Sequence, residues 1–306
     1  MVKKALLFSV LFMEVVFLNG QLILQSRADI LSSVVVSEVN ASYDTPEDVY
    51  TPEVVQIEAP VEPVSEVQTP PIVIIPPAVI SLKIGSVGEE ILFESEKDKE
   101  LPVASLTKLM TALVASKYYE PDQQITVSPE ATAQEGDQGS LQLGQVLTVK
   151  NLLYVSLIES SNKAAYSLSE LMGTQEFVAA MNKEAQELGL THTHFADPTG
   201  LSAQSYSTAY DVARLSKHIF ENYPLLKEMI SYKTFDLYVN GMFHHRLVNT
   251  NKLLEEMPVI VGGKTGWTNS ARGCFMTIEQ VEGGYIIHVV LGAEDRLLEM
   301  RKLIAQ

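Results

Sequence analysis

Serine and lysine stand three residues apart in Ser105-Leu106-Thr107-Lys108, and together they could carry out nucleophilic chemistry. A serine hydroxyl is a weak nucleophile until a base removes its proton. A lysine one helical turn further on can bring its amine to that hydroxyl. The positive field at a helix N-terminus also favours a developing oxyanion and disfavours a charged amine. A pair of this kind could supply a nucleophile, Ser105, and its base, Lys108.

A second segment, Ser160-Ser161-Asn162-Lys163, contains the same Ser-x-x-Lys spacing, so the spacing alone does not choose between the two serines. It also contains Ser160-x-Asn162, at the end of the helical pattern TVKNLLYVSLIES. Each segment can equally be a capping serine with a surface lysine, because Ser and Asn are common at helix boundaries.

A third motif, Gly263-Lys264-Thr265-Gly266, lies between a proline-containing loop and a strand pattern. Glycines on both sides of the Lys-Thr pair let another backbone approach closely. The pair would present one positive charge and one hydroxyl, which suits a substrate carboxylate. The alternative is a turn with a solvated lysine.

The elements that must position these motifs show strand and helix periodicity. A hairpin is expected from residues 78–86 and 90–96, with its turn at Val87-Gly88. After Ser105, apolar residues recur at helical spacing: Leu106, Leu109, Met110, Leu113 and Val114. Further helices are expected at 148–159, 162–171, 175–187 and 207–221, and strands at 233–239, 242–248, 273–280 and 284–293, before a closing helix that includes 297–306. The pattern predicts an α+β fold, an antiparallel sheet flanked by helices with an all-helical lobe.

The N-terminal part of the chain has a different composition. Lys3 and Lys4 precede the apolar run ALLFSVLFMEVVFL, which is the pattern of an export signal. Residues 1–28 are either a signal peptide or a membrane anchor; Glu14 interrupts the run and leaves insertion only slightly favourable. Residues 29–77 are rich in Pro, Val and acidic residues and predict a disordered linker.

Net charge and cysteine content argue against a nucleic-acid partner and against an intramolecular disulfide. The formal net charge is −16, which argues against a nucleic-acid partner bound by charge. Cys274 is the only cysteine, so an intramolecular disulfide is impossible. Its apolar, strand-like surroundings predict a small buried side chain.

The order of the three motifs is more specific than any one of them. Ser-x-x-Lys, then Ser-x-Asn, then Lys-Thr-Gly is the order of penicillin-binding proteins and class A β-lactamases. The segments PVASLTKLMTALVA, TVKNLLYVSLIESSNKAA, THFADPTGLSAQSYSTAYDVARLS, NTNKLL and GGKTGWTNSARGCF resemble serine-type D-alanyl-D-alanine carboxypeptidases of low molecular mass. The resemblance covers residues 78–306. It implies a catalytic domain of β-lactamase/transpeptidase-like fold and selects Ser105 over Ser160 as the nucleophile.

The resemblance also implies a catalytic role for four residues. Ser105 would attack the D-Ala-D-Ala peptide bond and become acylated, with neutral Lys108 as the base. Ser160 would pass a proton to the leaving amine, and Asn162 would orient Lys108 and the substrate amide. Water would then release the acyl group, with no metal or organic cofactor.

Substrate recognition is expected at the third motif. Lys264, Thr265 and Gly266 would bind the terminal carboxylate that marks a D-Ala end. The backbone N–H groups of Trp267 and Ser105 would form an oxyanion hole. The implied partners are peptidoglycan stem peptides, with β-lactam antibiotics as covalent inhibitors. The implied location is the cell envelope, with the N-terminal segment tethering the chain to the outer face of the cytoplasmic membrane.

Two features depart from the family pattern. Lys163 follows Ser-x-Asn where the family commonly has an aspartate, which puts the local charge pairing in question. The sequence also ends directly after the catalytic domain, so we expect it to lack the β-rich domain and amphipathic helix that follow in many relatives.

Other activities stay open. A D,D-endopeptidase would use the same residues on cross-linked peptides. A class A β-lactamase would need a carboxylate on a loop after the second motif, for which the sequence gives no confident equivalent. A penicillin-binding wall protein could have lost turnover.

Two histidine-containing segments could be read as further sites. His192-x-His194-x-x-Asp197 has metal-ligand spacing, but no His-Glu-x-x-His motif accompanies it. His244 and His245 are expected on opposite faces of a strand.

Overall fold

A computed structural model of the protein describes residues 77–306 except residue 137. The expected export segment, 1–28, and nearly all of the expected linker, 29–77, lie outside the described residues. Within the described part, no helix combines the length and apolar character needed to cross a bilayer.

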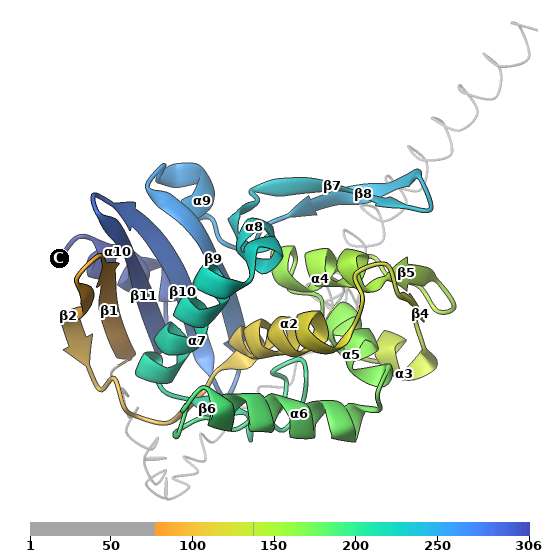
Figure 1. Ribbon diagram of the computed structural model, residues 1–306, viewed down its shortest axis with the longest axis horizontal. Coiled ribbons are helices and arrows are strands. Elements are labelled where there is room, and N and C mark those ends of the chain that lie inside the picture. Colours follow the sequence, from red (N-terminus) through yellow and green to blue (C-terminus); the bar gives the residue numbers. More distant parts are fainter. Residues whose placement is uncertain (1–76, 137) are drawn as a thin grey trace, which may run out of the picture. The chain divides into compact units, whose positions relative to one another are not determined.

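The centre of the fold is a five-stranded antiparallel sheet in the order β2-β1-β11-β10-β9. Its strands are β1 (Ala78–Gly85), β2 (Gly88–Ser95), β9 (Ile260–Thr268), β10 (Arg272–Val281) and β11 (Gly284–Ala293). The first described strand pairs with the last, with Ile80 opposite Val289, so the two ends of this part of the chain lie side by side (Figure 1). Strand β9 forms one edge of the sheet.

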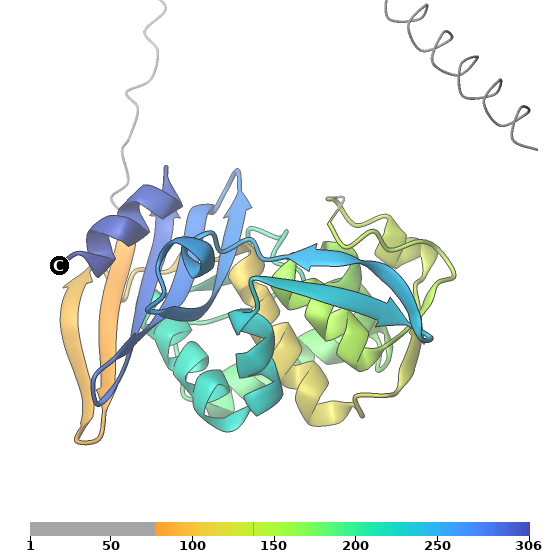
Figure 2. The same ribbon diagram turned by 90° about the horizontal axis from the view of Figure 1, so that it is seen from above.

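Helices cover both faces of this sheet. Alternate residues of β11 point to opposite faces: Ile287, Val289 and Leu291 join the main core, whereas Val290 packs in a smaller cluster with Met300 of α10 (Arg296–Ile304). Figure 2 shows α10 on one side of the sheet and α7 (Ala209–Asn222) on the other. Because both faces are covered, the middle parts of the two central strands, residues 274–278 of β10 and 287–291 of β11, are all buried.

A helical lobe lies beside the sheet, with α2 (Thr107–Tyr118) at its centre (Figure 1). The first nine residues of α2 are all buried, as expected for a helix surrounded by other elements. The helices that contact it are α4 (Val149–Ile158), α5 (Asn162–Glu170), α6 (Thr174–Glu187) and α7. The short α3 (Pro129–Thr132) adjoins α5, α8 (Pro224–Ser231) adjoins α4 and α7, and the short α9 (Leu253–Glu256) adjoins β9. Side chains cap several N-termini: Thr208, for example, accepts a hydrogen bond from Asp211 N at 3.0 Å.

Three two-stranded ribbons complete the described structure: β3 (Leu101–Pro102) with β6 (Tyr206–Ser207), β4 (Gln124–Thr126) with β5 (Val146–Thr148), and β7 (Thr234–Val239) with β8 (Met242–Val248). Asn240 and Gly241 both have positive φ in the β7–β8 turn. This is the conformation that an Asn-Gly hairpin favours.

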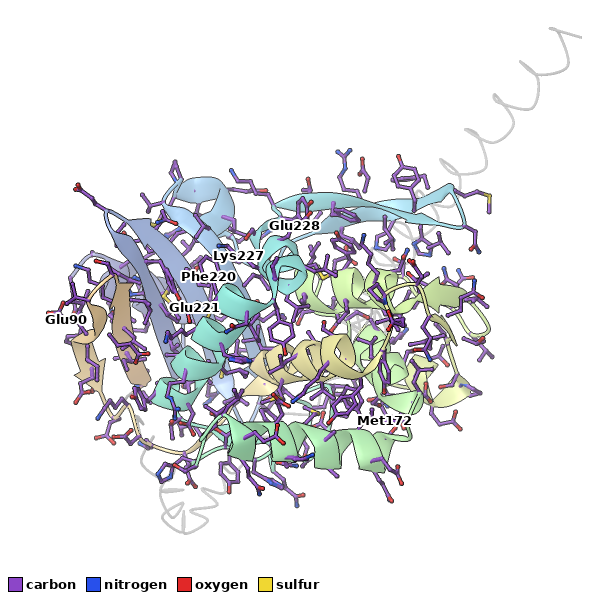
Figure 3. All side chains as sticks on the ribbon, in the orientation of Figure 1. Glu90, Met172, Phe220, Glu221, Lys227 and Glu228 are labelled. Atoms are coloured by element: carbon purple, nitrogen blue, oxygen red, sulfur yellow. The ribbon has the colours of Figure 1, made fainter. Side chains whose placement is uncertain are left out.

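Polar contacts also join the elements around the core (Figure 3). Lys227 Nζ of α8 lies 4.0 Å from the ring centre of Phe220 in α7, a cation–π contact. The Tyr285 hydroxyl of β11 donates to Glu221 of α7 at 2.9 Å. The first contact joins α8 to α7, and the second joins α7 to the sheet.

The predicted fold class is confirmed: the chain has an antiparallel sheet, flanking helices and a helical lobe. The buried position of Cys274 on a strand is confirmed as well. Several elements were not predicted: α8, β9, the short helices α3 and α9, and the short strands β3, β4, β5 and β6. Strand β9 contains Gly262, Gly263 and Gly266, and glycine is depleted in strands, so its sequence reads as a loop.

Candidate active site

Ser105 and Lys108 lie one turn apart where the helical lobe meets the sheet. Ser105 occupies a 3-10 turn, η1 (Ala104–Leu106), which leads directly into α2. Lys108 is completely buried, and its Nζ lies 2.8 Å from Ser105 Oγ. The pair therefore has the distance that proton transfer from a serine to a base requires.

Two other contacts fix the Lys108 amine. Its Nζ donates to Asn162 Oδ1 at 2.6 Å and to the Thr199 carbonyl oxygen at 2.7 Å. The orientation of the Asn162 amide follows from its Nδ2, which donates to the Glu135 carbonyl oxygen at 2.7 Å. Both carbonyl oxygens can only accept hydrogen bonds, so each of them pairs with one N–H of the amine. The third position of a neutral amine, its lone pair, is left for the Ser105 hydroxyl.

The protonation of Lys108 suits this arrangement. Burial lowers the pKa of Lys108 to about 7, with Asp197 acting in the opposite direction. A large fraction of the amine is therefore neutral near neutral pH. A neutral, oriented amine beside a serine hydroxyl has the arrangement that general-base chemistry requires.

Ser160 and Lys264 form a second serine–lysine pair beside the first. Lys264 Nζ donates to Ser160 Oγ at 2.6 Å and to its neighbouring Thr265 carbonyl oxygen at 2.9 Å. Lys264 is also completely buried, and burial, then the charges of Lys108 and Arg296, lower its pKa well below the usual value. Ser160 follows the end of α4 with a φ of 67°, a left-handed conformation that costs a non-glycine residue about 1–2 kcal/mol.

Strand β9 brings the third motif against the Ser105 turn. A Cβ on Gly266 would lie 2.7 Å from Ser105 N and 3.0 Å from Ala104 Cβ, so only glycine fits. The Thr265 hydroxyl donates to Thr250 Oγ1 at 2.7 Å, and Arg296 Nη1 donates to the Gly266 carbonyl oxygen at 3.0 Å. Trp267, the next residue, is 53% exposed.

The structure thus brings the eight sequence-predicted site residues to one place, the junction of η1, α2, α4, α5 and β9. Sequence reasoning missed the carbonyl groups of Thr199 and Glu135, because every residue type has a main-chain carbonyl. It also missed Thr250 and Arg296. The string Asp197-Pro198-Thr199-Gly200 did carry a turn signal.

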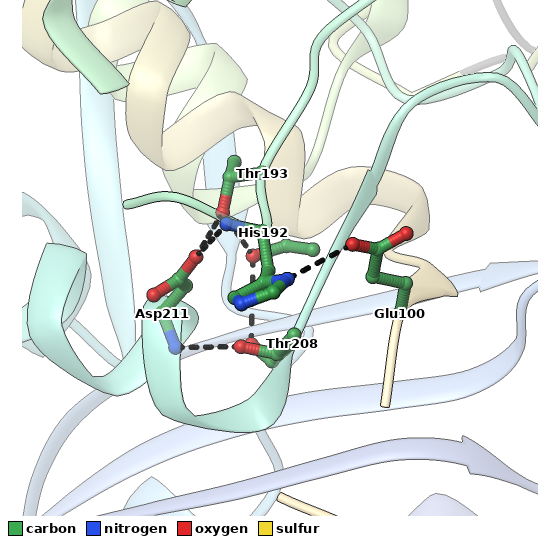
Figure 4. Close-up of polar contacts among 6 residues, drawn as sticks. Glu100, His192, Thr193, Thr208 and Asp211 are labelled. Atoms are coloured by element: carbon green, nitrogen blue, oxygen red, sulfur yellow. Dashed lines mark hydrogen bonds and ion pairs between the residues drawn. The ribbon is translucent and has the colours of Figure 1, made fainter. Parts of the chain in front are cut away.

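The side chains of His192, His194 and Asp197 have different partners in the structure. His192 Nδ1 lies 3.0 Å from Glu100 Oε1, while its backbone N–H donates to Asp211 (Figure 4). The His194 ring packs against Tyr206, and Asp197 accepts hydrogen bonds from its own loop. Within residues 77–306 except 137, no three His, Cys, Asp or Glu side chains cluster in a way that could hold a metal ion.

The expectation for His244 and His245 was wrong. Their imidazole Nδ1 atoms lie 2.6 Å apart, and neither residue is fully exposed. A β-bulge interrupts the alternation here: His245 pairs with Leu237 and Phe243 with Tyr238, so His244 is the extra residue. The two rings also have polar partners, with His245 Nε2 3.0 Å from Glu159 Oε2 and His244 Nε2 2.6 Å from Gln145 Nε2.

Comparison with protein families matches residues 81–295 to the family described as D-alanyl-D-alanine carboxypeptidase. The chain is 32% identical over 226 residues to the D-alanyl-D-alanine carboxypeptidase DacF of Bacillus subtilis, which covers 70% of this chain and 58% of the relative. It is 30% identical over 210 residues to the D-alanyl-D-alanine endopeptidase of Escherichia coli, covering 67% of each protein. The match thus spans less than two thirds of the Bacillus protein.

Solved structures give the same grouping. A D-alanyl-D-alanine carboxypeptidase from Mycobacterium tuberculosis is 25% identical with a TM-score of 0.67, over 79% of this chain and 96% of that one. Penicillin-binding protein D2 from Listeria monocytogenes, in its ampicillin-bound form, is 28% identical with a TM-score of 0.63, over 74% and 95%.

Proposed function

Because this chain belongs to the D-alanyl-D-alanine carboxypeptidase family, we propose that it removes the terminal D-alanine from peptidoglycan stem peptides through an acyl-enzyme on Ser105. One observation carries the proposal: Lys108 Nζ is buried, lies 2.8 Å from Ser105 Oγ, and gives its other two contacts to carbonyl oxygens. An amine held in this way can take a proton from only one group, the serine hydroxyl.

Acylation follows from this geometry. Lys108 takes the Ser105 proton as Oγ attacks the carbonyl carbon of the D-Ala-D-Ala bond. The oxyanion that forms is stabilised by the backbone N–H groups of Ser105 and Trp267, at about 3 kcal/mol per donor. Ser160 passes a proton to the departing D-alanine nitrogen as the C–N bond breaks, and the proton held by Lys108 replaces it, so that Lys108 is neutral again. A water molecule then attacks the ester and restores the Ser105 hydroxyl.

The terminal carboxylate is assigned to the β9 edge. Lys264 and Thr265 offer an amine and a hydroxyl there, and Arg296 lies behind the strand on Gly266. A bound carboxylate would favour the charged form of Lys264, whose pKa is depressed by burial. Substrates that end in a free D-alanine carboxylate are therefore preferred.

The test is D-alanine release from diacetyl-Lys-D-Ala-D-Ala by the full chain and by its Ser105→Ala variant. Release by the wild type alone supports the proposal. Release by both proteins, or by neither, contradicts it.

A D,D-endopeptidase activity is the second candidate, because the Escherichia coli relative carries that name at 30% identity. The same residues would act on a cross-linked peptide. Digestion of a purified cross-linked muropeptide dimer separates the two: an endopeptidase converts it to monomers, whereas a carboxypeptidase releases D-alanine only from free ends.

The remaining proposals concern inhibitors and location. We propose β-lactams as covalent inhibitors, in line with the ampicillin-bound Listeria structure. We also propose export to the cell envelope, with the N-terminal segment tethering the enzyme to the outer face of the cytoplasmic membrane. Cell fractionation followed by the mass of the mature protein tests this, because a cleaved signal peptide leaves a shorter chain in the soluble fraction.

A further inference from the structure

The loop of residues 197–205 is organised by one carboxylate. Asp197 Oδ1 accepts from Thr199 N at 2.7 Å, Thr199 Oγ1 at 2.5 Å, Gly200 N at 2.6 Å and Leu201 N at 3.3 Å, and Oδ2 accepts from Ser202 N and Ser205 Oγ, both at 3.0 Å. These donors all come from residues that follow Asp197 in the chain. The carboxylate therefore holds the loop in one conformation.

This loop is docked directly on the catalytic helix. The Thr199 carbonyl oxygen accepts from Lys108 Nζ at 2.7 Å, and the neighbouring Pro198 carbonyl oxygen accepts from Thr111 Oγ1 at 2.6 Å. A Cβ on Gly200 would lie 1.8 Å from the Ala104 carbonyl oxygen, so the loop also lies against the residue before Ser105. Only Pro198 separates Asp197 from Thr199, whose carbonyl oxygen accepts a hydrogen bond from Lys108.

Asp197 also carries a charge next to that amine. Burial alone would raise the pKa of Asp197, but hydrogen bonds from Thr199, Ser202 and Gly200 outweigh it and lower the pKa, so the group is ionised at neutral pH. Its charge acts on Lys108, and raises the pKa of that amine against the effect of burial. The charge of Lys108 also acts on Lys264 of β9, as does that of Arg296 on α10.

We propose that Asp197 is a positioning residue of the reaction, which fixes the Thr199 carbonyl oxygen on Lys108 and whose negative charge governs how readily Lys108 accepts the Ser105 proton. The inference rests on the proposed function, because it assigns Lys108 as the base. It gives a second task to the loop, beyond packing on α2.

Asp197 does not act as a base toward water. Four donors occupy Oδ1 and two occupy Oδ2. A carboxylate accepts through about four lone-pair sites, so none is left to activate a water molecule. The loop carboxylate that a class A β-lactamase would use is thus not supplied by Asp197.

The test compares Asp197→Asn with Asp211→Asn in the full chain. Asp211 is a matched control, since it is also buried and also accepts from a backbone N–H and a hydroxyl, those of His192 and Thr193, at 3.0 and 2.9 Å (Figure 4). None of its hydrogen bonds reaches Lys108 or the Thr199 carbonyl. The readout is the second-order rate of acylation by a fluorescent penicillin from pH 5 to 10, with thermal melting of each protein.

In the wild type the rate rises with pH as Lys108 loses its proton, around pH 7. Asp197→Asn removes the charge that raises the pKa, so the rise moves to lower pH, by about 0.5 to 1 unit. The plateau rate falls about 10-fold or more because the Thr199 carbonyl is less firmly held. Asp211→Asn lowers the melting temperature but leaves the midpoint and the plateau unchanged.

Equal pH midpoints and plateau rates for Asp197→Asn and Asp211→Asn would overturn the proposal. Should Asp197→Asn not fold, Thr199→Val decides instead, since it removes one donor to Asp197 and keeps the carbonyl. Slower acylation by Thr199→Val supports the proposal, and an unchanged rate contradicts it. A wild type that is acylated but releases no D-alanine would overturn only the carboxypeptidase assignment, whereas a wild type that is not acylated would overturn both.

Discussion

Gly266 and Ser105 approach so closely that a Cβ on Gly266 would lie 2.7 Å from Ser105 N. The first residue is on the edge strand β9 and the second is in the turn before α2. Their contact joins the Lys264-Thr265-Gly266 motif to the Ser105 turn, and it brings the backbone of the next residue, Trp267, beside the serine.

Gly266→Ala is expected to reduce acylation about 100-fold, because the added methyl must move either β9 or the Ser105 turn by a sizeable fraction of an ångström. Fluorescent-penicillin labelling measures the rate. Gly85→Ala is the control, since the nearest atom to its added Cβ is 3.8 Å away, in ordinary contact. Equal rates for the two variants would show that the close approach has no catalytic importance.

Lys108→Met is expected to slow acylation by about 10³-fold, within the range that a general base contributes. The residual rate should also lose its rise around pH 7, since the titrating amine is gone. Stopped-flow acylation from pH 5 to 10 checks both points. A variant that kept the wild-type pH profile would show that another group is the base.

Burial of Lys108 should also make the free energy of unfolding depend on pH. The pKa of this amine is 10.5 when unperturbed and about 7 in the folded protein, so the unfolded chain binds its proton more tightly. The free energy of unfolding therefore rises with pH between about 7 and 10.5. Below pH 7 the amine is charged in both the folded and the unfolded protein, so folding bears the full cost of burying the charge. Relative to Lys108→Met, the wild type should gain up to about 1.4 kcal/mol per pH unit in this window.

Denaturant unfolding at pH 7, 8, 9 and 10 measures that gain. The exposed Lys183, with a side-chain exposure of 67%, supplies the control variant Lys183→Met, which should show no such slope. A stability difference between wild type and Lys108→Met that is constant over this range would contradict the depressed pKa.

Ser160 should both carry backbone strain and supply a hydroxyl that D-alanine release needs. At a φ of 67°, Ser160→Gly relieves about 1 kcal/mol of backbone strain, whereas Ser160→Ala keeps it. Both variants lose the hydroxyl that contacts Lys264 and should lose D-alanine release by about 100-fold. Thermal melting should rank Ser160→Gly above Ser160→Ala.

Asn240→Gly, at a φ of 51° in the distant β7–β8 turn, is the matched control and should keep full activity. If Ser160→Ala were as active as this control, the Ser160 hydroxyl would have no part in proton transfer.

Periodicity predicted the elements that surround the site but not all of those that complete it. The apolar spacing of Leu106, Leu109 and Met110 was enough to predict α2, because a buried helix must present such a stripe. Strand β9 was missed since its glycines, which lower strand propensity, serve the close approach to Ser105. Contacts with the rest of the fold, rather than the strand propensity of its own residues, determine that β9 is a strand.

The side chains of the site were predicted from motif order, whereas their environment was not. No residue type signals that the Thr199 carbonyl will accept from Lys108, because any residue carries that group. The pairing of His244 with His245 was mispredicted because a β-bulge at His244 interrupts the strand alternation, and the sequence carries no signal for that bulge.

The most direct test of the central claim is the location of the covalent adduct formed by benzylpenicillin on the full chain, read by mass spectrometry of its peptides. The sequence contains two Ser-x-x-Lys segments, and only Ser105 has its hydroxyl 2.8 Å from the amine of a completely buried lysine three residues on. We predict a single adduct on the peptide that contains Ser105, and none on the Ser105→Ala variant. An adduct on Ser160, or no adduct on the wild type, would contradict the account.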